Sequence, residues 1–498
     1  MMPNRKTYLA VDLGASSGRL VAGRFDGSKL SLHDVHRFEN GAVSFNNRLQ
    51  WNLPGLWQNI KDGMRKAKIE YGVSIESIGV DTWGVDFGFL GPHDELLGNP
   101  YHYRDSQTAG ILPSVFEVVP REEIFRLTGL QFMELNTLYQ LIAMRRAENP
   151  VLQMAESMLL IPDLFHWLMT GVKTNERTNA STTQFFDPRA NAWAGELLEK
   201  FDIPTHFLQP ITDPGTNIGR LLPRLQEETG LTATDVILPG THDTASAVMA
   251  VPTSSTGSTD WCYISSGTWS LMGVETGLPM INERVGELNF TNEAGVGGTT
   301  RLLKNIAGLW LIQECRRIWQ EEGRNLEWFH LVEAANESSP LVSLIEPDHP
   351  RFVAPRSMPE EIRTYCRETG QPVPETDGAI IRCALESLAM RYRMVLEWLE
   401  EIVGNRIETV HIVGGGTQNE LLCQMAADAC NRRIVTGPVE ATAIGNLMQQ
   451  LISRGDVASI AEARSIIAQS FDVNTYEPQQ AAAWEEAYPR FRALTEQG

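Results

Sequence analysis

The sequence predicts an α/β protein whose two halves share one order of strands, loops and helices. Three observations support this prediction. Short apolar runs bounded by Gly, Ser, Asp and Asn alternate with segments in which apolar residues recur every three or four positions. Each half opens with a strand, a loop of small residues and a second strand, at residues 8–25 and 261–274. Between the halves, residues 249–259 are rich in Pro, Ser, Thr and Gly, which is typical of a linker.

The first half begins with three strands that are expected to pair antiparallel. The turn signal Asp26-Gly27 joins the second of these strands to the third. Residues 53–71 carry apolar residues at helical spacing and precede a further buried strand. The four strands are predicted at residues 8–12, 20–25, 30–38 and 77–81.

The second half repeats this opening, and the shared pattern indicates internal duplication. One helix is predicted over residues 304–314, on which Asn305 and Gln313 would lie ~12 Å apart along the axis. Strands are predicted at 261–265, 269–274, 410–413 and 433–435, and helices at 381–399, 419–430, 441–453 and 478–494, with a polar surface excursion over 336–374. The predicted domains are residues 1–250, residues 251–455 and a helical segment over 456–498.

The composition narrows the classes of partner and compartment. The chain has 62 acidic and 42 basic residues, and its net charge of −20 repels the phosphate backbone of nucleic acids. No apolar run approaches the ~18 residues of a membrane helix, and Asp12 interrupts the apolar run near the N-terminus, which argues against a signal peptide. The six cysteines form no CxxC pair, so we expect free thiols rather than a structural zinc site. These features predict a cytoplasmic protein without a nucleic-acid or membrane partner.

The segment Asp12–Arg19 (DLGASSGR) places a Gly- and Ser-rich loop directly after a strand. Backbone N–H groups of such a loop can approach phosphate oxygens, and Arg19 adds a charge-assisted donor. Asp12 is placed to orient hydrated Mg²⁺ beside a phosphate. The alternative interpretation is a plain hairpin turn. The chain lacks the GxxxxGK[ST] motif, so a phosphate site here would differ from a P-loop.

The segment Asp81–Phe87 (DTWGVDF) combines aromatic, acidic and glycine residues at the end of a predicted strand. Trp83 and Asp86 are a typical pair for stacking on a sugar and binding its hydroxyl groups, and Gly84 would let a ligand approach the backbone. A strand end with a core tryptophan is the alternative, and this segment alone favours it. Residues 103–105 (YRD) form a similar aromatic and polar cluster.

The segment Pro239–Val248 (PGTHDTASAV) places His242, Asp243 and Thr244 in front of a helix of small residues. An aspartate at this position can cap the helix, or it can act as the general base that accepts a proton from a sugar hydroxyl. Both interpretations stay open on these residues alone. His242 is a candidate for substrate contact.

Two further loops have the composition of nucleotide sites. Residues 265–273 (SSGTWSLMG) repeat the strand–loop–strand order of the first loop. Residues 411–419 (HIVGGGTQN) join a strand to a helix through three glycines, a shape that suits phosphate binding. The spacing differs from GxGxxG, so a Rossmann dinucleotide site is not supported.

Taken in order, these segments resemble the FGGY family of carbohydrate kinases. Nine segments occur in the family's order and cover nearly the full chain. They are VDLGASSGR, SIGVDTWGVDF, YRDS, NTLYQL, HDTASAV, SSGTWSLMG, LLKNIAGLWLIQ, HIVGGGTQN and GPVEATAIGN. The resemblance implies two ribonuclease H-like domains of the actin/Hsp70/hexokinase type, with the active site in an interdomain cleft whose closure excludes water.

The resemblance also implies roles for individual residues. Asp243 is implied as the catalytic base and as a contact to the sugar. The other implied sugar contacts are Gly84, His242, Thr244 and Asn305. The implied ATP contacts are Ala15, Ser16, Ser17, Gly18, Arg19, Thr268, Gln313 and Gly415. ATP is implied as co-substrate and Mg²⁺ as cofactor, with no ligand to the metal assigned.

DTWGVDF, HDTASAV and KNIAGLWL are particular to one branch of the family, which implies phosphorylation of L-rhamnulose at its 1-hydroxyl in L-rhamnose degradation. One alternative is another ketose, such as L-fuculose, L-ribulose or D-xylulose. A second is an actin-like ATP-driven protein without kinase activity, and a third is a dehydrogenase that uses Gly414–Gly416. Members of this branch can carry a disulfide at the spacing that separates Cys366 from Cys383. They can also carry a CxxxC pair near Cys430, but its first position here is Ala426.

Overall fold

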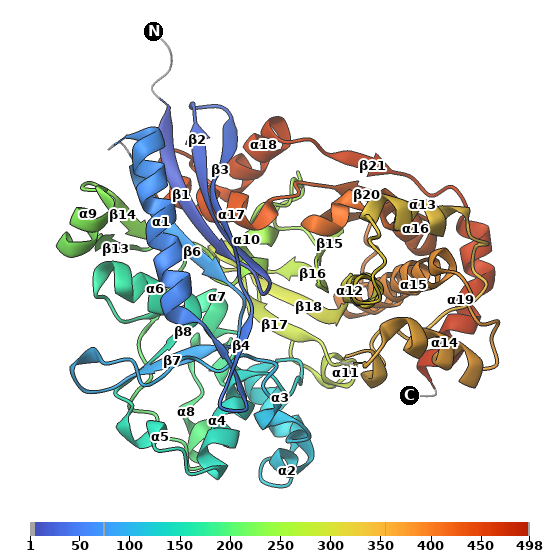
Figure 1. Ribbon diagram of the computed structural model, residues 1–498, viewed down its shortest axis with the longest axis horizontal. Coiled ribbons are helices and arrows are strands. Elements are labelled where there is room, and N and C mark those ends of the chain that lie inside the picture. The colour runs from blue at the N-terminus through green and yellow to red at the C-terminus, as the bar shows by residue number, and fades with distance from the viewer. Residues whose placement is uncertain (1–4, 73–74, 354, 497–498) are drawn as a thin grey trace. The chain divides into compact units, whose positions relative to one another are not determined.

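The computed structural model describes residues 5–72, 75–353 and 355–496 (Figure 1). The chain divides into two compact units, and each is assembled from separate stretches of sequence. Unit 1 comprises Met1–Gly257, Glu275–Leu302 and Ala441–Phe471, and unit 2 comprises Ser258–Val274, Leu303–Glu440 and Asp472–Gly498. The sequence-based division at 250 and 455 is contiguous, whereas these units interleave along the chain because strands and helices distant in sequence pack together.

Unit 1 is built on a six-stranded sheet in the order β13-β14-β6-β1-β2-β3. β1 pairs antiparallel with β2 and parallel with β6, and β2 pairs antiparallel with β3. The predicted three-stranded opening is therefore confirmed. The strands are β1 (Lys6–Leu13), β2 (Ser17–Phe25), β3 (Leu30–Glu39), β6 (Ile75–Thr82), β13 (Asn217–Arg220) and β14 (Asp235–Ile237).

Helices cover both faces of this sheet, which explains why β1 is apolar along its length. Leu9 and Val11 share a buried cluster with residues of α1 (Leu53–Tyr71) and α6 (Ile161–Thr170). Side chains of alternate residues point to opposite faces of a strand. Gly79 of β6 faces α17 (Ala441–Ser453), since a Cβ there would lie 2.9 Å from the Asn446 side chain. The Asn446 amide also donates to the carbonyl of Gly79 at 3.3 Å.

The helix α1 has the bounds predicted from its periodicity. The Oδ1 atom of Asn52 accepts a hydrogen bond from the N–H of Gly55 at 3.1 Å, and Gly72 ends the helix with φ of +76°. Its buried face is formed by Leu56, Ile60, Met64 and Ala67 together with Leu53 and Gly63. The predicted helix over residues 441–453 likewise matches α17.

Smaller elements complete unit 1. The hairpin β4–β5 was not predicted, because both of its strands are only four residues long and β4 is exposed along its length. Asn46 and Asn47 form its turn with φ of 51° and 60°, a conformation that asparagine tolerates. The remaining strands are β4 (Ala42–Phe45), β5 (Arg48–Trp51), β7 (Phe87–Leu90), β8 (Ser157–Leu160), β9 (Asn175–Glu176), β10 (Phe186–Asp187), β11 (Ala192–Trp193), β12 (Ile211–Thr212) and β17 (Thr291–Ala294). The remaining helices are α2 (Leu112–Phe116), α3 (Arg121–Thr128), α4 (Thr137–Arg146), α5 (Val151–Met154), α7 (Arg177–Ala180), α8 (Gly195–Glu199), α9 (Pro223–Thr229), α10 (Asp243–Met249), α11 (Glu283–Glu287) and α18 (Ile460–Ser470).

The second sheet has seven strands in the order β17-β18-β16-β15-β19-β20-β21. β15 pairs antiparallel with β16 and parallel with β19, which repeats the pairing of β1 with β2 and β6. The strands are β15 (Trp261–Ser266), β16 (Trp269–Thr276), β18 (Thr300–Ala307), β19 (Thr409–Val413), β20 (Arg433–Thr436) and β21 (Asn474–Tyr476). The helices of unit 2 are α12 (Trp310–Glu321), α13 (Trp328–Glu337), α14 (Met358–Glu368), α15 (Asp377–Val403), α16 (Glu420–Cys430) and α19 (Ala481–Thr495).

The predicted helix over residues 304–314 is wrong. Asn305 lies in the strand β18, and α12 begins only after the break at Gly308. The N–H groups of Leu309 and Trp310 donate to carbonyls of the loop between β15 and β16, at 2.9 and 3.1 Å. These bonds replace the helical bonds that would have continued through the break, so Asn305 and Gln313 do not share a helix axis.

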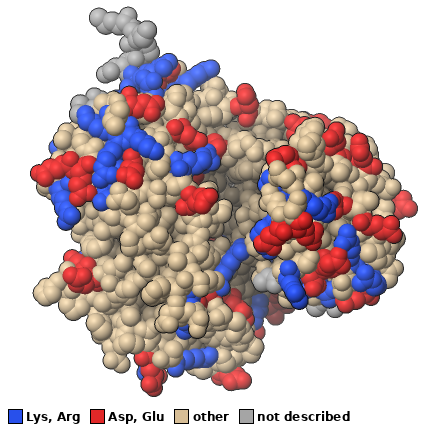
Figure 2. All heavy atoms as spheres, in the orientation of Figure 1, with Lys and Arg blue, Asp and Glu red and all other residues tan. Residues whose placement is uncertain are grey.

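The surface carries mixed charge on the face shown in Figure 2, where acidic and basic side chains are interspersed. On α1, Arg65 pairs with Asp62, and on β3, Arg37 pairs with Asp34. In the described ranges, no helix combines the length and the apolar character that crossing a membrane requires.

Candidate active site

The first predicted phosphate loop joins β1 to β2 and is held by the residue that follows β3. The side-chain amide of Asn40 donates to the carbonyl of Gly14 at 2.7 Å, and its N–H donates to the carbonyl of Ser16 at 3.2 Å. Ser16 and Ser17 are exposed and Ala15 is half-buried, so the loop presents polar groups to solvent. Gly18 is buried, and a Cβ there would meet the Phe38 ring at 2.3 Å. Gly18 is thus needed for packing of the loop.

Arg19 is paired with Asp12 across β1 and β2. Its Nε and Nη2 atoms donate to one carboxylate oxygen of Asp12 at 2.9 and 2.6 Å. Both side chains are largely buried. This pairing holds the guanidinium beside the loop and partly neutralises Asp12.

Two more carboxylates of unit 1 interact electrostatically with Asp12. Asp81 stands opposite Asp12 in the parallel register of β1 and β6. It is fully buried; its Oδ2 accepts from the Asn446 amide at 2.6 Å, and its Oδ1 has no hydrogen-bond partner among the described residues. Burial, and then the charges of Asp12 and Asp243, raise the pKa of Asp81 well above its usual range. These acids therefore create a negative field that favours a cation or a shared proton.

Asp243 is the first residue of α10, and the N-cap is His242, whose side chain makes no capping hydrogen bond. The capping interpretation of Asp243 is therefore wrong. Its Oδ1 accepts from the N–H of Thr244 at 2.6 Å and from the Thr244 hydroxyl at 3.1 Å. The side chain is 33% exposed, and desolvation of the carboxyl raises its pKa, although the positive charge of His242 in its protonated form opposes the shift. Asp243 is thus an oriented carboxylate with a raised affinity for protons.

Gly84 follows a segment, Thr82–Trp83, that is hydrogen-bonded to the backbone just before His242 and Asp243. The N–H of Thr82 donates to the carbonyl of Thr241 at 2.9 Å. The Asn179 amide donates to the carbonyls of both Trp83 and Thr241, at 3.3 and 3.4 Å. A Cβ on Gly84 would meet Thr182 at 2.9 Å, so a glycine is required for the backbone to pass this side chain. The segments that contain Gly84, His242, Asp243 and Thr244 are thereby brought together.

Glu176 anchors the same region from the buried side. Its carboxylate accepts from the N–H and hydroxyl of Thr241, at 3.0 and 2.7 Å, and from the hydroxyl of Thr178 at 2.5 Å. Burial raises its pKa. Each of these bonds restrains the backbone just before His242 and Asp243.

Asp86 belongs to the core, as the alternative interpretation of its segment held. Its carboxylate accepts four hydrogen bonds, from Trp51 Nε1 at 2.6 Å, Trp83 Nε1 at 3.0 Å, the N–H of Tyr103 at 3.1 Å and Gln140 Nε2 at 2.9 Å. Trp51 and Trp83 stack with their ring centroids 3.8 Å apart. Burial raises the pKa of Asp86 to about 7. This carboxylate ties together the aromatic residues beneath the Gly84 segment.

Thr268, Gln313 and Gly415 lie on three segments of unit 2. The loop that contains Thr268 accepts hydrogen bonds from the N-terminal residues of α12, one turn from Gln313. Gly415 is exposed, and its neighbour Gly416 packs against the end of β15. A Cβ on Gly416 would come within 2.0 Å of Ser266 Oγ. The loop after β15 and the loop after β19 are therefore in direct contact. Asn305 is half-buried on β18, the strand beside β16.

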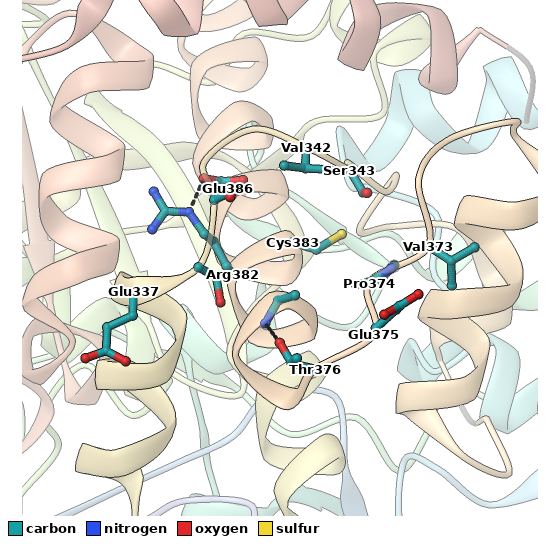
Figure 3. A pocket seen from close by; sticks show the side chains of 13 residues that line it. Glu337, Val342, Ser343, Val373, Pro374, Glu375, Thr376, Arg382, Cys383 and Glu386 are labelled. Carbon is teal, nitrogen blue, oxygen red and sulfur yellow. Dashed lines mark hydrogen bonds and ion pairs between the residues drawn. The ribbon is translucent and has the colours of Figure 1, made fainter.

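A cavity of about 390 Å³ in unit 2 is separate from these residues (Figure 3). Some of the residues within 337–343, 373–376 and 379–386 line it. None of the predicted site residues does so. Its polar groups bond one another, as Arg382 Nε does with Glu386 at 2.7 Å. Cys383 lines it, and all six cysteines, Cys366 included, are buried free thiols.

Two family models match the chain, the N-terminal domain of the FGGY family of carbohydrate kinases over residues 7–250 and its C-terminal domain over residues 262–454. The chain belongs to the FGGY family of carbohydrate kinases. It is 43% identical to the rhamnulokinase of Bacteroides thetaiotaomicron, over 98% of this chain and 99% of that protein. It is 41% identical to the rhamnulokinase of Pectobacterium atrosepticum, over 99% of this chain and 97% of that protein.

Solved structures show that this FGGY kinase has the two-domain fold of the family. The ligand-bound xylulose kinase of Lactobacillus acidophilus superposes with a TM-score of 0.81 at 16% identity, over 99% of this chain and 98% of that one. The glycerol kinase of Plasmodium falciparum with ADP gives a TM-score of 0.78 at 13% identity, over 99% and 98% of the two chains. The sequence-based assignment of fold and family is confirmed.

Sequence reasoning did not single out four residues that support the site. Asp81 and Glu176 act through buried hydrogen bonds, and Glu293 and Arg301 contact His242 from β17 and β18. Only Asp81 carried a local signal, since it ends the buried strand that was predicted over residues 77–81. The others meet the site through tertiary packing.

We predict that Asp86→Asn alters the pH dependence of stability. The folded pKa of about 7 exceeds the unfolded value of ~3.9, so the folded state holds a proton that the unfolded state has lost between these pH values. The stability that this proton confers is present below about pH 4 and is lost as the pH rises to 7. Between pH 5 and pH 7 the wild type should lose about 2–3 kcal/mol relative to Asp86→Asn.

Urea unfolding midpoints at a series of pH values measure this difference. Asp62→Asn, at an exposed carboxylate of α1, is the matched control and should follow the wild type. Parallel pH profiles of wild type and Asp86→Asn would show that Asp86 is ionised throughout.

We also predict that Gly416→Ala weakens ATP binding. The added Cβ must displace Ser266, and with it the loop that carries Thr268. We expect the KM for ATP to rise roughly tenfold while the KM for the sugar stays within about twofold, as expected when ~1.4 kcal/mol of nucleotide binding is lost. Gly277→Ala, at a position with open space around it, is the control. An unchanged KM for ATP would refute a role of this loop contact.

Proposed function

We propose that this kinase transfers the γ-phosphoryl group of ATP to the 1-hydroxyl of L-rhamnulose, forming L-rhamnulose 1-phosphate and ADP in L-rhamnose degradation. One observation carries the choice of acceptor. Seven relatives named rhamnulokinase are 39–43% identical to this chain and align with 94–99% of its length. The structures of xylulose and glycerol kinases share its fold at 13–19% identity and do not bear on the acceptor.

The proposed base is Asp243, which accepts the proton of the 1-hydroxyl as the oxygen attacks the γ-phosphorus. The two hydrogen bonds from Thr244 reach Oδ1, which leaves Oδ2 to accept the proton. The raised pKa of Asp243 strengthens it as a base. Gly84, His242 and Thr244 are the proposed sugar contacts of unit 1, and Asn305 is the proposed contact of unit 2.

The proposed nucleotide contacts fall into two groups. Ala15–Arg19 in unit 1 and Thr268 in unit 2 would bind the phosphates, because both lie at a turn of small residues between two antiparallel strands. Gln313 and Gly415 would contact the remainder of the nucleotide. A reaction that consumes ATP also suits the cytoplasm, the compartment predicted from the sequence.

The acidic residues of unit 1 fit a divalent cation brought in with the nucleotide. Among the described residues, no three His, Cys, Asp or Glu side chains are arranged to hold a metal by themselves. Mg²⁺ is usually held by one or two carboxylates together with phosphate oxygens and water. Asp12 is the proposed residue for this role. Asp81 lies at the matching position of the neighbouring strand, and its Oδ1 has no hydrogen-bond partner among the described residues. When bound, Mg²⁺ would offset the negative charge of the phosphates.

Asp243→Asn should lower kcat by about 10²–10⁴-fold, because the amide cannot accept the hydroxyl proton. The amide retains an oxygen for the Thr244 bonds, so nucleotide affinity should change less than about threefold. Coupled-assay kinetics and nucleotide titration measure the two quantities. Asp34→Asn, an exposed carboxylate on β3, serves as the control. Turnover near the wild-type value would disprove the assignment of the base.

The acceptor is tested by ADP release over a panel of L-rhamnulose, L-fuculose, L-ribulose, D-xylulose and glycerol. We expect the highest kcat/KM for L-rhamnulose. A higher kcat/KM for another ketose would show that this ketose is the acceptor, while the assignment as a kinase would stand. ATP hydrolysis that no sugar stimulates would instead favour an actin-like ATPase.

A further inference from the structure

A buried ion pair lies directly behind His242, on the side opposite Asp243. Arg301 is fully buried and Glu293 nearly so, and Arg301 Nη2 lies 3.1 Å from a carboxylate oxygen of Glu293. The imidazole Nδ1 of His242 lies 3.1 Å from the same Nη2 and 3.3 Å from the same carboxylate oxygen. The imidazole Nε2 lies 3.4 Å from Oδ1 of Asp243. The four side chains thus form a continuous polar chain within unit 1.

This geometry discriminates between the two neutral tautomers of His242. If Arg301 donates to Nδ1, the proton sits on Nε2 and points to the carboxylate of Asp243. If Nδ1 instead donates to Glu293, the Nε2 atom of neutral His242 carries a lone pair. This lone pair faces the carboxylate of Asp243, which repels it. The first arrangement places an N–H group 3.4 Å from Oδ1 of Asp243, beside the two hydrogen bonds from Thr244.

The surroundings of the ion pair hold the guanidinium of Arg301 where it can donate to Nδ1 of His242. Its Nε donates to the carbonyl of Ala294 at 3.1 Å, which fixes the plane of the guanidinium. Burial works against ionisation of Glu293, but the charge of Arg301 holds its pKa below the usual range. Glu293 therefore stays a carboxylate and keeps the guanidinium in place.

We propose that Glu293 and Arg301 are positioning residues that hold His242 with its Nε2–H directed at Oδ1 of Asp243. In this role they leave Oδ2 of Asp243 as the oxygen that accepts the substrate proton. Neither residue touches the substrate in this proposal, and both act through His242. The inference rests on the proposed role of Asp243 as base.

A purely structural role is the competing explanation, and paired variants separate the two. Removing one partner of a buried ion pair leaves an uncompensated charge, whereas removing both together is often neutral for stability. We therefore compare Glu293→Gln with the double variant Glu293→Gln/Arg301→Met. The double variant should regain a thermal midpoint near that of the wild type. Its kcat should nevertheless fall about 10–100-fold, with the KM for ATP within about twofold, because the base is misoriented.

The matched control is Glu275→Gln/Arg464→Met, which removes another buried ion pair of unit 1. Arg464 Nη2 donates to Glu275 at 2.6 Å, and this pair does not contact His242. Its kcat should stay within about twofold of the wild type. A kcat loss of equal size in the control and in the Glu293/Arg301 variant would assign both pairs to structure and overturn the proposal.

A double-mutant cycle tests whether the effect passes through His242. In a His242→Asn background, the Glu293→Gln/Arg301→Met change should lower kcat less than about threefold further. Losses that multiply in full would show that the ion pair acts without His242, and a folded double variant with wild-type kcat would show that it does not act at all. Either result overturns the proposal while Asp243→Asn remains inactive. Turnover retained by Asp243→Asn would instead remove the base assignment itself.

Discussion

The parallel pairing of β1 with β6 is the interaction on which the chemistry of unit 1 depends. It places Asp12 and Asp81 at matching positions near the ends of neighbouring strands. The isolated bridge between Thr82 and His242 then extends the order from β6 to the start of α10. Residues that are about 70 and 230 positions apart in the chain thereby meet at one edge of the sheet, where the carboxyl ends of parallel strands are open to ligands.

Buried polar groups hold this edge in one conformation. Glu176 and Asn179 bond the backbone on both sides of the bridge, and Asp86 gathers the aromatic residues beneath it. The carboxylates of Glu176 and Asp86 have lost their hydration and are each compensated by several hydrogen bonds, so loss of one partner is costly. The result is a rigid support for Asp243, as a general base needs when the position of one oxygen decides the rate.

The same edge concentrates negative charge that protein groups only partly neutralise. Arg19 pairs with Asp12 and Asn446 with Asp81, yet Oδ1 of Asp81 has no partner in the described part of the chain. Burial raises the pKa values of Asp81 and Asp243, and the charge of Asp12 adds to both shifts. A cation that arrives with ATP would offset this negative charge, which connects the electrostatics of the protein to the charge of its proposed substrate.

Local sequence alone determined the first strands of both units, the loops between these strands and several of the helices. Helices α1 and α17 follow from apolar periodicity, and the Asp26-Gly27 turn follows from its composition, because these signals act over a few residues. The ordered motifs also determined the family. Tertiary structure decided which residues support Asp243. It made Asp243 the first helical residue behind a His242 N-cap, assigned Asp86 to the core and placed Asn305 on a strand. It also brought Glu293 and Arg301 to His242 from strands some 50 residues away. The reason is physical: burial and hydrogen-bond partners depend on packing between distant segments, and no local pattern encodes them.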